Sequence, residues 1–322
     1  MKEISFIRQN IEKWRSFETV VDAASNEDPG RLADTYMELT TDLSFSRSHY
    51  PRSRITVYLN NLASALHNSL YKNKKESHTR IFDFWKTEVP LVMYASRKEL
   101  LYSFLIFLIS AAIGCLSTIH DDTFARLVMS NAYIDMTLQN IAEGNPMGVY
   151  DTMSPVSMFF MIVLNNVRVA FIIFVFGLLT GFGTGSMLFY NGIMIGCFQT
   201  FFFQQHLGIE SMMAIWLHGT LEISAIIIAG AGGLALGNGW LFPGTYPRGY
   251  AFRRGASRGL KIVVGMVPVL LFAGFVESFL TRYTSIPNVV RGGFILLSLV
   301  FVLYYAIYLP KRLSYGIPKP QN

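Results

Sequence analysis

The chain has 322 residues, of which 52% are hydrophobic and 15% are charged, and its mean hydropathy is +0.36. This composition is too apolar for an ordinary soluble domain and indicates an integral membrane protein. The formal net charge is +6, but much of the basic excess lies beside apolar runs. That pattern is typical of membrane orientation and not of nucleic-acid binding. Cys115 and Cys197 both lie in apolar runs, so neither a disulfide framework nor a CxxC metal motif is expected.

Residues 1–99 are polar and predict a cytoplasmic helical region. One apolar helix face is indicated by residues that recur every three or four positions, namely Ile4, Ile7, Ile11, Trp14, Phe17 and Val21. Further helices are expected to begin near Pro29 and Pro51. Residues 79–96 mix aromatic and basic side chains and predict an interfacial helix. No signal peptide is expected, because the first 19 residues lack an apolar core.

Six apolar runs follow, and each is long enough to cross a bilayer with some tilt: 100–119, 155–181, 184–206, 211–237, 260–281 and 289–309. The sequence therefore predicts an all-α membrane bundle of six transmembrane helices over 100–309, with a tail at 310–322. The third run is rich in glycine, so a re-entrant or broken helix is the alternative there.

Loop charges predict the orientation of these runs. The loop 120–154 carries five acidic residues and one arginine, so it is expected outside, with an amphipathic helix at 120–150. The loop 238–259 carries four arginines and no acidic residue, so it is expected inside. Six spans with both termini in the cytoplasm satisfy these counts, and a re-entrant third run does not.

Ionisable side chains within the apolar runs are the candidate functional residues, since charge is costly in a bilayer. His218 and Glu222 are four residues apart and share one helix face. A rise of about 1.5 Å per residue places Asn166, Arg168 and Glu222 near the midplane, and His218 and Glu277 nearer the outer surface. These depths predict an Arg168–Glu222 ion pair and, at a separate level, a His218–Glu277 pair.

The simplest role of such polar groups is to cross-link helices; a proton, ion or ligand site is the alternative, followed by catalysis. His218, Glu222 and Glu277 are candidate metal ligands, although HGTLE lacks the second histidine of HExxH. Asn191 is expected to cap a bent backbone. No cofactor is expected.

Three segments together resemble the stage II sporulation protein M family of bacterial membrane proteins: VLNNVRVAFIIFVFGLLTGFGTGSMLFYNGIMIG, WLHGTLEISAIIIAGAGGLALG and PVLLFAGFVESFLT. The resemblance covers roughly Glu99–Leu309. It implies motif positions at Asn166, Asn191, His218, Glu222 and Glu277. It also implies a location in the bacterial inner membrane and a scaffold similar to the one that recruits peptidoglycan hydrolases during spore engulfment.

The expected function is thus a scaffold or assembly protein of the cell envelope. A transporter or ion-coupled protein with an intramembrane His/Glu/Arg site is the alternative. An intramembrane enzyme ranks last, because no nucleophile–base arrangement is visible. The expected partners are membrane lipid and envelope or cytoplasmic proteins, the latter because residues 1–99 go beyond the scaffold's short form. Glycine-rich helices further predict a homodimer.

Overall fold

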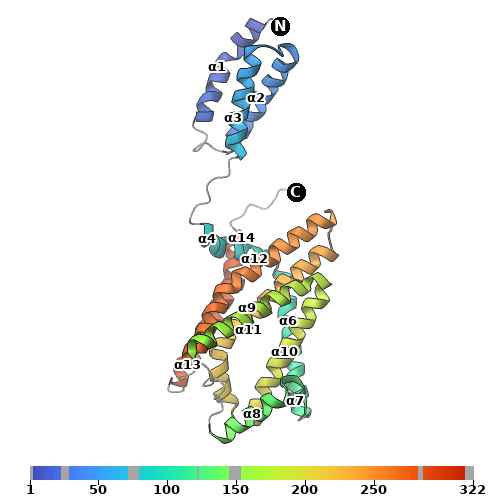
Figure 1. Ribbon diagram of the computed structural model, residues 1–322, viewed down its shortest axis with the longest axis vertical. Helices are drawn as coiled ribbons and strands as arrows, with labels where there is room; N and C mark the ends of the chain where they lie inside the picture. Colours follow the sequence, from blue (N-terminus) through green and yellow to red (C-terminus); the bar gives the residue numbers. More distant parts are fainter. Residues whose placement is uncertain are drawn as a thin grey trace. The chain divides into compact units, whose positions relative to one another are not determined.

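In the computed structural model every described element is a helix (Figure 1). The described residues are 3–22, 29–71, 80–121, 123–144, 154–281 and 286–315. The chain divides into two compact units, Met1–Arg80 and Ile81–Asn322. The N-terminal unit contains α1 (Glu3–Asp22), α2 (Pro29–His49) and α3 (Arg54–Tyr71).

The second unit contains the remaining elements. Its helices are, in chain order, α4 (Arg80–Asp83), a π-helical turn (Phe84–Glu88), α5 (Val89–Ala95), α6 (Arg97–His120), α7 (Phe124–Met129), α8 (Asn131–Ala142), α9 (Pro155–Val175), a 3₁₀ turn (Phe176–Leu179), α10 (Thr180–Gln204), α11 (Gly208–Leu241), α12 (Arg248–Phe275), a π-helical turn (Val276–Leu280), α13 (Asn288–Leu303), a π-helical turn (Tyr304–Tyr308) and α14 (Leu309–Tyr315).

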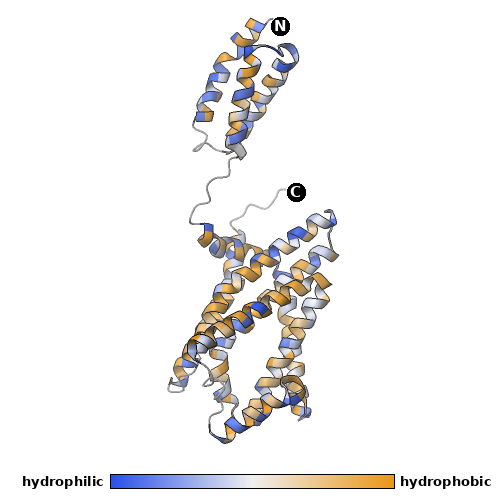
Figure 2. Ribbon diagram, in the orientation of Figure 1, coloured by the Kyte–Doolittle hydropathy of each residue, from blue (hydrophilic) through white to orange (hydrophobic). Residues whose placement is uncertain are grey.

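The N-terminal unit is a three-helix bundle with its own core. Apolar and polar residues alternate along its helices, as Figure 2 shows, so each helix has one face to bury. Among the described residues of this unit, the fully buried hydrophobic side chains are Trp14, Leu39, Leu59 and Leu66. The predicted apolar face of α1 included Ile4, and this part of the prediction is wrong. The Ile4 side chain is 67% exposed, whereas Phe6 lies in the core.

α11 is the central helix of the second unit and packs against α6, α9, α10, α12 and α13. Its AGAGGLALG segment is buried along its whole length. A Cβ on Gly233 would lie 2.7 Å from the Ile173 backbone oxygen of α9, and one on Gly232 would lie 2.9 Å from the Gly259 oxygen of α12. Small residues therefore let the neighbouring backbones approach α11 closely.

Five helical stretches of the described chain are long and apolar enough to cross a membrane: Arg97–His120, Pro155–Gln204, Gly208–Leu241, Arg248–Leu280 and Asn288–Tyr315. The sequence predicted six separate helices. The difference arises because no loop separates the second and third apolar runs: α9 continues through its 3₁₀ turn directly into α10. The direction changes at Thr180, whose φ is +69°, and Figure 1 shows α9 and α10 meeting at a corner.

The segment expected to be an interfacial helix, 79–96, is described from Arg80 onward as α4, a π-helical turn and α5. It packs on other helices of the second unit. The Trp85 indole N–H donates to the Gly265 oxygen at 3.2 Å, and the Tyr305 hydroxyl donates to the Trp85 oxygen at 2.8 Å. Lys261 pairs with Glu88 at 2.7 Å. The second compact unit begins at Ile81 and thus includes this segment.

The amphipathic helix expected at 120–150 is two short helices, α7 and α8. The chain breaks at Ser130, whose φ of +75° is incompatible with a continuous helix. Both helices pack on α10 through one apolar cluster, which contains Ala125, Ile134, Cys197, Phe201 and Phe202. Residues 145–153 lie outside the described chain, as do 316–322 of the expected tail.

Candidate functional site

A polar cluster lies between α9, α11 and the π-helical turn that comes after α12. His218 and Glu222 lie one turn apart on α11, and Glu277 lies in the π-helical turn Val276–Leu280. His218 is only 4% exposed. Asn166 reaches the cluster from α9.

The cluster is held by short polar contacts. His218 Nε2 lies 3.7 Å from Glu277 Oε1, and His218 Nδ1 lies 3.2 Å from the Thr281 hydroxyl oxygen. Asn166 Nδ2 donates to Glu222 Oε1 at 2.5 Å. The carboxyl groups of Glu222 and Glu277 are close neighbours in this cluster. One ligand atom from each of His218, Glu222 and Glu277 lies within 4.8 Å of the others.

The local backbone sets the position of Thr281, which contacts His218, relative to Glu277. The Thr281 N–H donates to the Val276 oxygen, five residues earlier, at 3.0 Å, which is the hydrogen bond of a π-helical turn. Such a turn inserts one extra residue and rotates the side chains beyond it. Gly274 lets this region approach α9, since a Cβ there would lie 2.6 Å from Val163 Cγ2.

The polar groups form one cluster and not the two depth levels expected from the sequence. The depth estimate treated each helix as a straight α-helix perpendicular to the membrane. α12 instead contains Pro268 and ends in the π-helical turn, and both features change the register that a uniform rise predicts. As a result, Glu277 contacts both His218 and Glu222.

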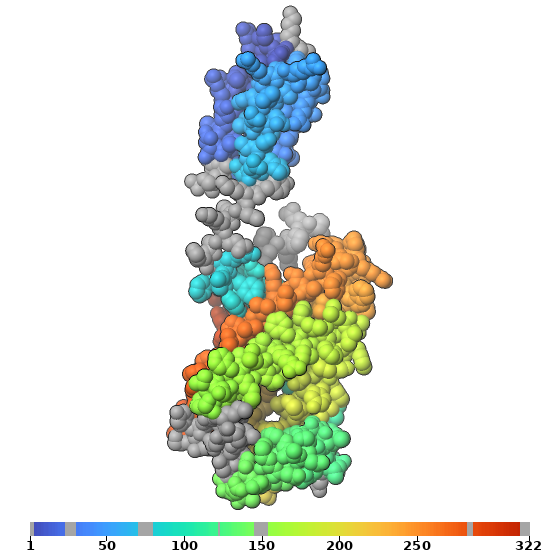
Figure 3. Space-filling view, in the orientation of Figure 1, coloured from blue at the N-terminus to red at the C-terminus, as the bar shows by residue number. Residues whose placement is uncertain are grey.

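Arg168 is not part of the cluster, so the expected Arg168–Glu222 ion pair does not form. Arg168 is exposed, as is Asn165, one turn before it. Figure 3 shows α9 uncovered on the near face of the second unit. Arg168 is two positions after Asn166 on the helix, which amounts to a rotation of about 200°. Because Asn166 faces Glu222, Arg168 must point away from it.

Asn191 also lies apart from the cluster. Its amide donates to the Met187 oxygen of its own helix, α10, at 2.8 Å. This bond to the preceding turn is a common local use of an asparagine side chain within a helix. Thr281, by contrast, was not among the candidate residues, although its hydroxyl contacts His218. Its position four residues after Glu277 repeats the spacing of His218 and Glu222.

The chemistry of the cluster is that of a site for a proton or a cation. Within the described residues, no lysine or arginine forms an ion pair with Glu222 or Glu277. Two contacting carboxyl groups need a shared proton or a cation to offset their repulsion. A zinc ion would require ligand atoms about 3.3 Å apart, so the three side chains would have to close by about 1.5 Å from their 4.8 Å spread.

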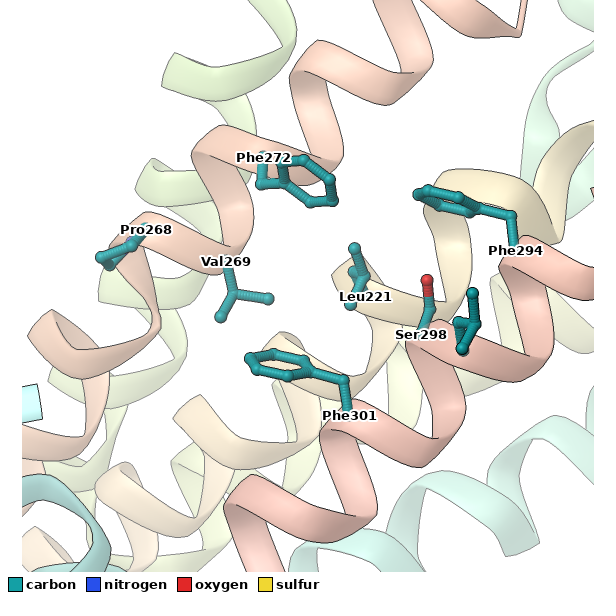
Figure 4. A pocket seen from close by; sticks show the side chains of 8 residues that line it. Leu221, Pro268, Val269, Phe272, Phe294, Ser298 and Phe301 are labelled. Atoms are coloured by element: carbon teal, nitrogen blue, oxygen red, sulfur yellow. The ribbon is translucent and has the colours of Figure 1, made fainter. Parts of the chain in front are cut away.

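A separate cavity of about 380 Å³ lies between α11, α12 and α13. Figure 4 shows the aromatic rings of Phe272, Phe294 and Phe301 around it, with the Ser298 hydroxyl as the labelled polar group. Among the described residues, no titratable side chain lines this cavity. It is therefore an apolar packing gap and not an extension of the polar cluster.

Comparison with known proteins accounts for the second unit. Residues 103–282 match the family model described as stage II sporulation protein M. This match covers more than half of the chain and includes the complete polar cluster. The chain belongs to the stage II sporulation protein M family. Residues 4–72 match a domain of unknown function (DUF8413), and no curated protein and no solved structure matches the chain.

Membership in the stage II sporulation protein M family agrees with the resemblance found in the sequence, over slightly shorter bounds. The second match coincides with helices α1–α3 of the N-terminal unit. The protein is therefore a sporulation protein M family membrane unit joined to a separate helical domain.

Proposed function

We propose that this protein is a membrane scaffold of the bacterial cell envelope, in which the N-terminal unit binds a partner protein. The observation that carries the proposal is the independence of that unit. It has a complete core of its own, it forms a separate compact unit, and it matches its own family model. A helical domain attached to a membrane anchor is suited to protein binding.

The proposed topology has six crossings with both termini in the cytoplasm. The stretch Pro155–Gln204 has 50 residues and would be about 75 Å long as one straight helix, far more than a hydrocarbon core of about 30 Å. α9 and α10 separately have lengths of about 32 and 38 Å. Each therefore suits one crossing, with the reversal near Thr180. The four arginines in the first turns of α12, which were expected in a loop at 238–259, then lie on the cytoplasmic side.

The topology test compares two described glycines in loops, Gly144 and Gly244. Single cysteines at these positions, in a background with both native cysteines replaced, are labelled with a membrane-impermeant maleimide in intact cells. Six crossings predict labelling at 144 and protection at 244. Labelling at both positions would mean that α9 and α10 cross only once together.

The scaffold test compares the full-length protein with a variant that lacks residues 1–72, both expressed in the native membrane. Proximity labelling from the C-terminus is expected to identify a protein that is enriched with the full chain and lost with the shortened one. An identical set of neighbours for both proteins, at equal membrane levels, would contradict the proposal.

A homodimer is also proposed, although the glycines that suggested it make contacts within the chain. Gly177 contacts Gly233, and Gly196 contacts Ala111. Cross-linking in native membranes is expected to yield a dimer band. A monomer alone would remove this part of the proposal.

A second candidate function, an ion-coupled membrane protein, is favoured by the three ligand atoms within 4.8 Å. Glu277→Gln and Glu222→Gln keep the shape of the side chains and remove the charge. If the cluster only joins helices, stability and function are expected to fall together. If it binds an ion, function is lost at full stability, and elemental analysis of the purified protein shows whether that ion is a metal.

A further inference from the structure

A long groove opens along one side of the second unit, apart from the polar cluster. α11 forms its floor, α6 forms one wall, and α13 with α14 forms the other. Its volume is about 680 Å³, within the usual range of ligand pockets. The groove exists because α6 and α13 both pack on α11 and make few contacts with each other.

The interior of the groove is apolar over most of its length. Ile227 and Ile228 of α11 form its floor, and Phe104 and Leu303 form parts of its walls. Phe104 and Leu303 are both about half exposed, at 47% each. Of the described residues, Ser224 is the only polar side chain on the floor, and its hydroxyl donates to the Thr220 oxygen of its own helix at 2.6 Å. The interior thus offers no polar recognition and suits a hydrocarbon chain.

The mouth of the groove is basic. Arg97, at the start of α6, and Lys311, in α14, line it from opposite walls, and no acidic residue of the described chain lines the groove. Arg97 is held over the ring of Tyr94 at 4.7 Å and donates to the Tyr94 oxygen at 3.1 Å. Both basic side chains are exposed. Two cations at the end of an apolar groove attract an anion attached to a hydrocarbon chain.

The dimensions of the groove favour a lipid over a transmembrane helix. Along the α13 wall, the groove runs from Lys311 to Leu299, which is about 18 Å at the helical rise. One leaflet of the hydrocarbon core is about 15 Å deep. A helix segment of that length, about 10 Å wide, would occupy about 1,400 Å³, roughly twice the volume of the groove.

We propose that this groove binds an anionic phospholipid, with its phosphate between Arg97 and Lys311 and an acyl chain along Ile227, Phe104 and Leu303. The site is independent of the proposed scaffold function. Because the two basic residues come from opposite ends of the membrane unit's sequence, a bound lipid connects α6 with α14. Such a lipid fills the space that α6 and α13 leave over α11.

The test uses the full-length protein in detergent and native mass spectrometry. Phosphatidylglycerol and phosphatidylcholine with identical acyl chains are added separately, and bound lipid is counted. The double variant Arg97→Gln, Lys311→Gln removes the two mouth charges. Its control is Lys98→Gln, Arg312→Gln, which removes the same total charge from adjacent exposed residues outside the groove.

The wild type is expected to prefer phosphatidylglycerol over phosphatidylcholine. In the mouth variant, the ratio of the two affinities is expected to fall roughly 30-fold. The control is expected to stay close to the wild type. Equal loss in both variants, or an unchanged preference in the mouth variant, would overturn the proposal.

A second pair of variants tests the acyl-chain position. Leu303→Trp fills the groove, whereas Leu296→Trp places the same ring on an exposed position of α13 that does not line it. Only Leu303→Trp is expected to reduce binding of both lipids. If it leaves lipid binding intact, the acyl chain does not occupy the groove. If it instead abolishes a dimer and leaves lipid binding unchanged, the groove is occupied by a second copy and the proposal is wrong.

Discussion

Gly196→Ala is expected to destabilise the contact between α6 and α10. A Cβ at this position would lie 2.0 Å from the Ala111 backbone oxygen and 3.0 Å from the Cys115 nitrogen. Ordinary van der Waals contact begins at 3.4 Å, so the two backbones must separate by about 1.4 Å, the difference between 3.4 and 2.0 Å. Neither obstacle is a flexible side chain that can rotate away.

The expected magnitude is set by two opposing effects. Overpacking a close contact costs about 1–3 kcal/mol, while replacing glycine by alanine within a helix returns up to about 1 kcal/mol. Gly185→Ala is the matched control. It lies on the same helix and also faces α6, but its Cβ would lie 4.0 Å from Ile106 Cδ1, the end of a flexible side chain. Gly185→Ala is therefore expected to be neutral or slightly stabilising.

The chain contains a built-in probe of this contact. Its two cysteines, Cys115 and Cys197, both lie at the α6–α10 crossing. Cys197 is fully buried, and the Cys115 thiol donates to the Gly196 oxygen at 3.4 Å. Maleimide labelling in detergent at increasing temperature is expected to reach both thiols earlier in Gly196→Ala than in the wild type. Unchanged labelling and an unchanged melting temperature would refute the reasoning.

Three further outcomes are expected. Asn166→Leu removes the amide that donates to Glu222 and should lower the free energy of unfolding by about 1–3 kcal/mol, measured by melting in detergent. Asn165→Leu, on the exposed face of the same helix, should be tolerated. Equal losses of stability in the two variants would contradict the assignment of Asn166 to the buried face. Asp42→Ala removes the acceptor of the Trp14 indole N–H at 2.8 Å and should destabilise the N-terminal unit by about 1–3 kcal/mol. On heating, tryptophan fluorescence should then change at a lower temperature than in the wild type, while cysteine labelling should begin at the same temperature. Burial and a hydrogen bond to a glutamate raise the pKa of Tyr58 from 10.0 to about 12. The contribution of Tyr58 to stability is therefore present below pH 10 and is lost as the pH rises toward about 12. Tyr58→Phe should weaken this loss of stability at alkaline pH, and a pH profile identical to that of the wild type would refute the prediction.

The helical character of the chain and four residues of its polar cluster, Asn166, His218, Glu222 and Glu277, could be predicted from the sequence. Apolar runs of about 20 residues predict spanning helices because backbone polar groups must be satisfied internally in a membrane. His218 and Glu222 could be placed on one face because the helical period depends only on their spacing. The same period also places Arg168 and Asn166 on opposite sides of α9, so it already argues against pairing Arg168 with Glu222.

Other features depend on contacts between helices or on single backbone angles. The apolar pattern on both sides of Thr180 is the same whether a loop is present or not, so hydropathy could not reveal that α9 and α10 are continuous. The glycines indicated close packing, but only the fold showed which backbones within the chain Gly177 and Gly196 approach.

By itself, the sequence determined the all-helical class, the membrane character and the His218–Glu222 pair, since these depend on local composition and periodicity; the family followed from the resemblance of three motif segments. The tertiary structure decided that Glu277 lies beside both residues and that Thr281 contacts His218. The physical reason is that these contacts join helices distant in sequence, and their alignment depends on Pro268 in α12 and on the π-helical turn after it, which a uniform helical period does not predict. The groove between α6 and α13 also depends on tertiary packing, because two helices distant in sequence form its walls against α11.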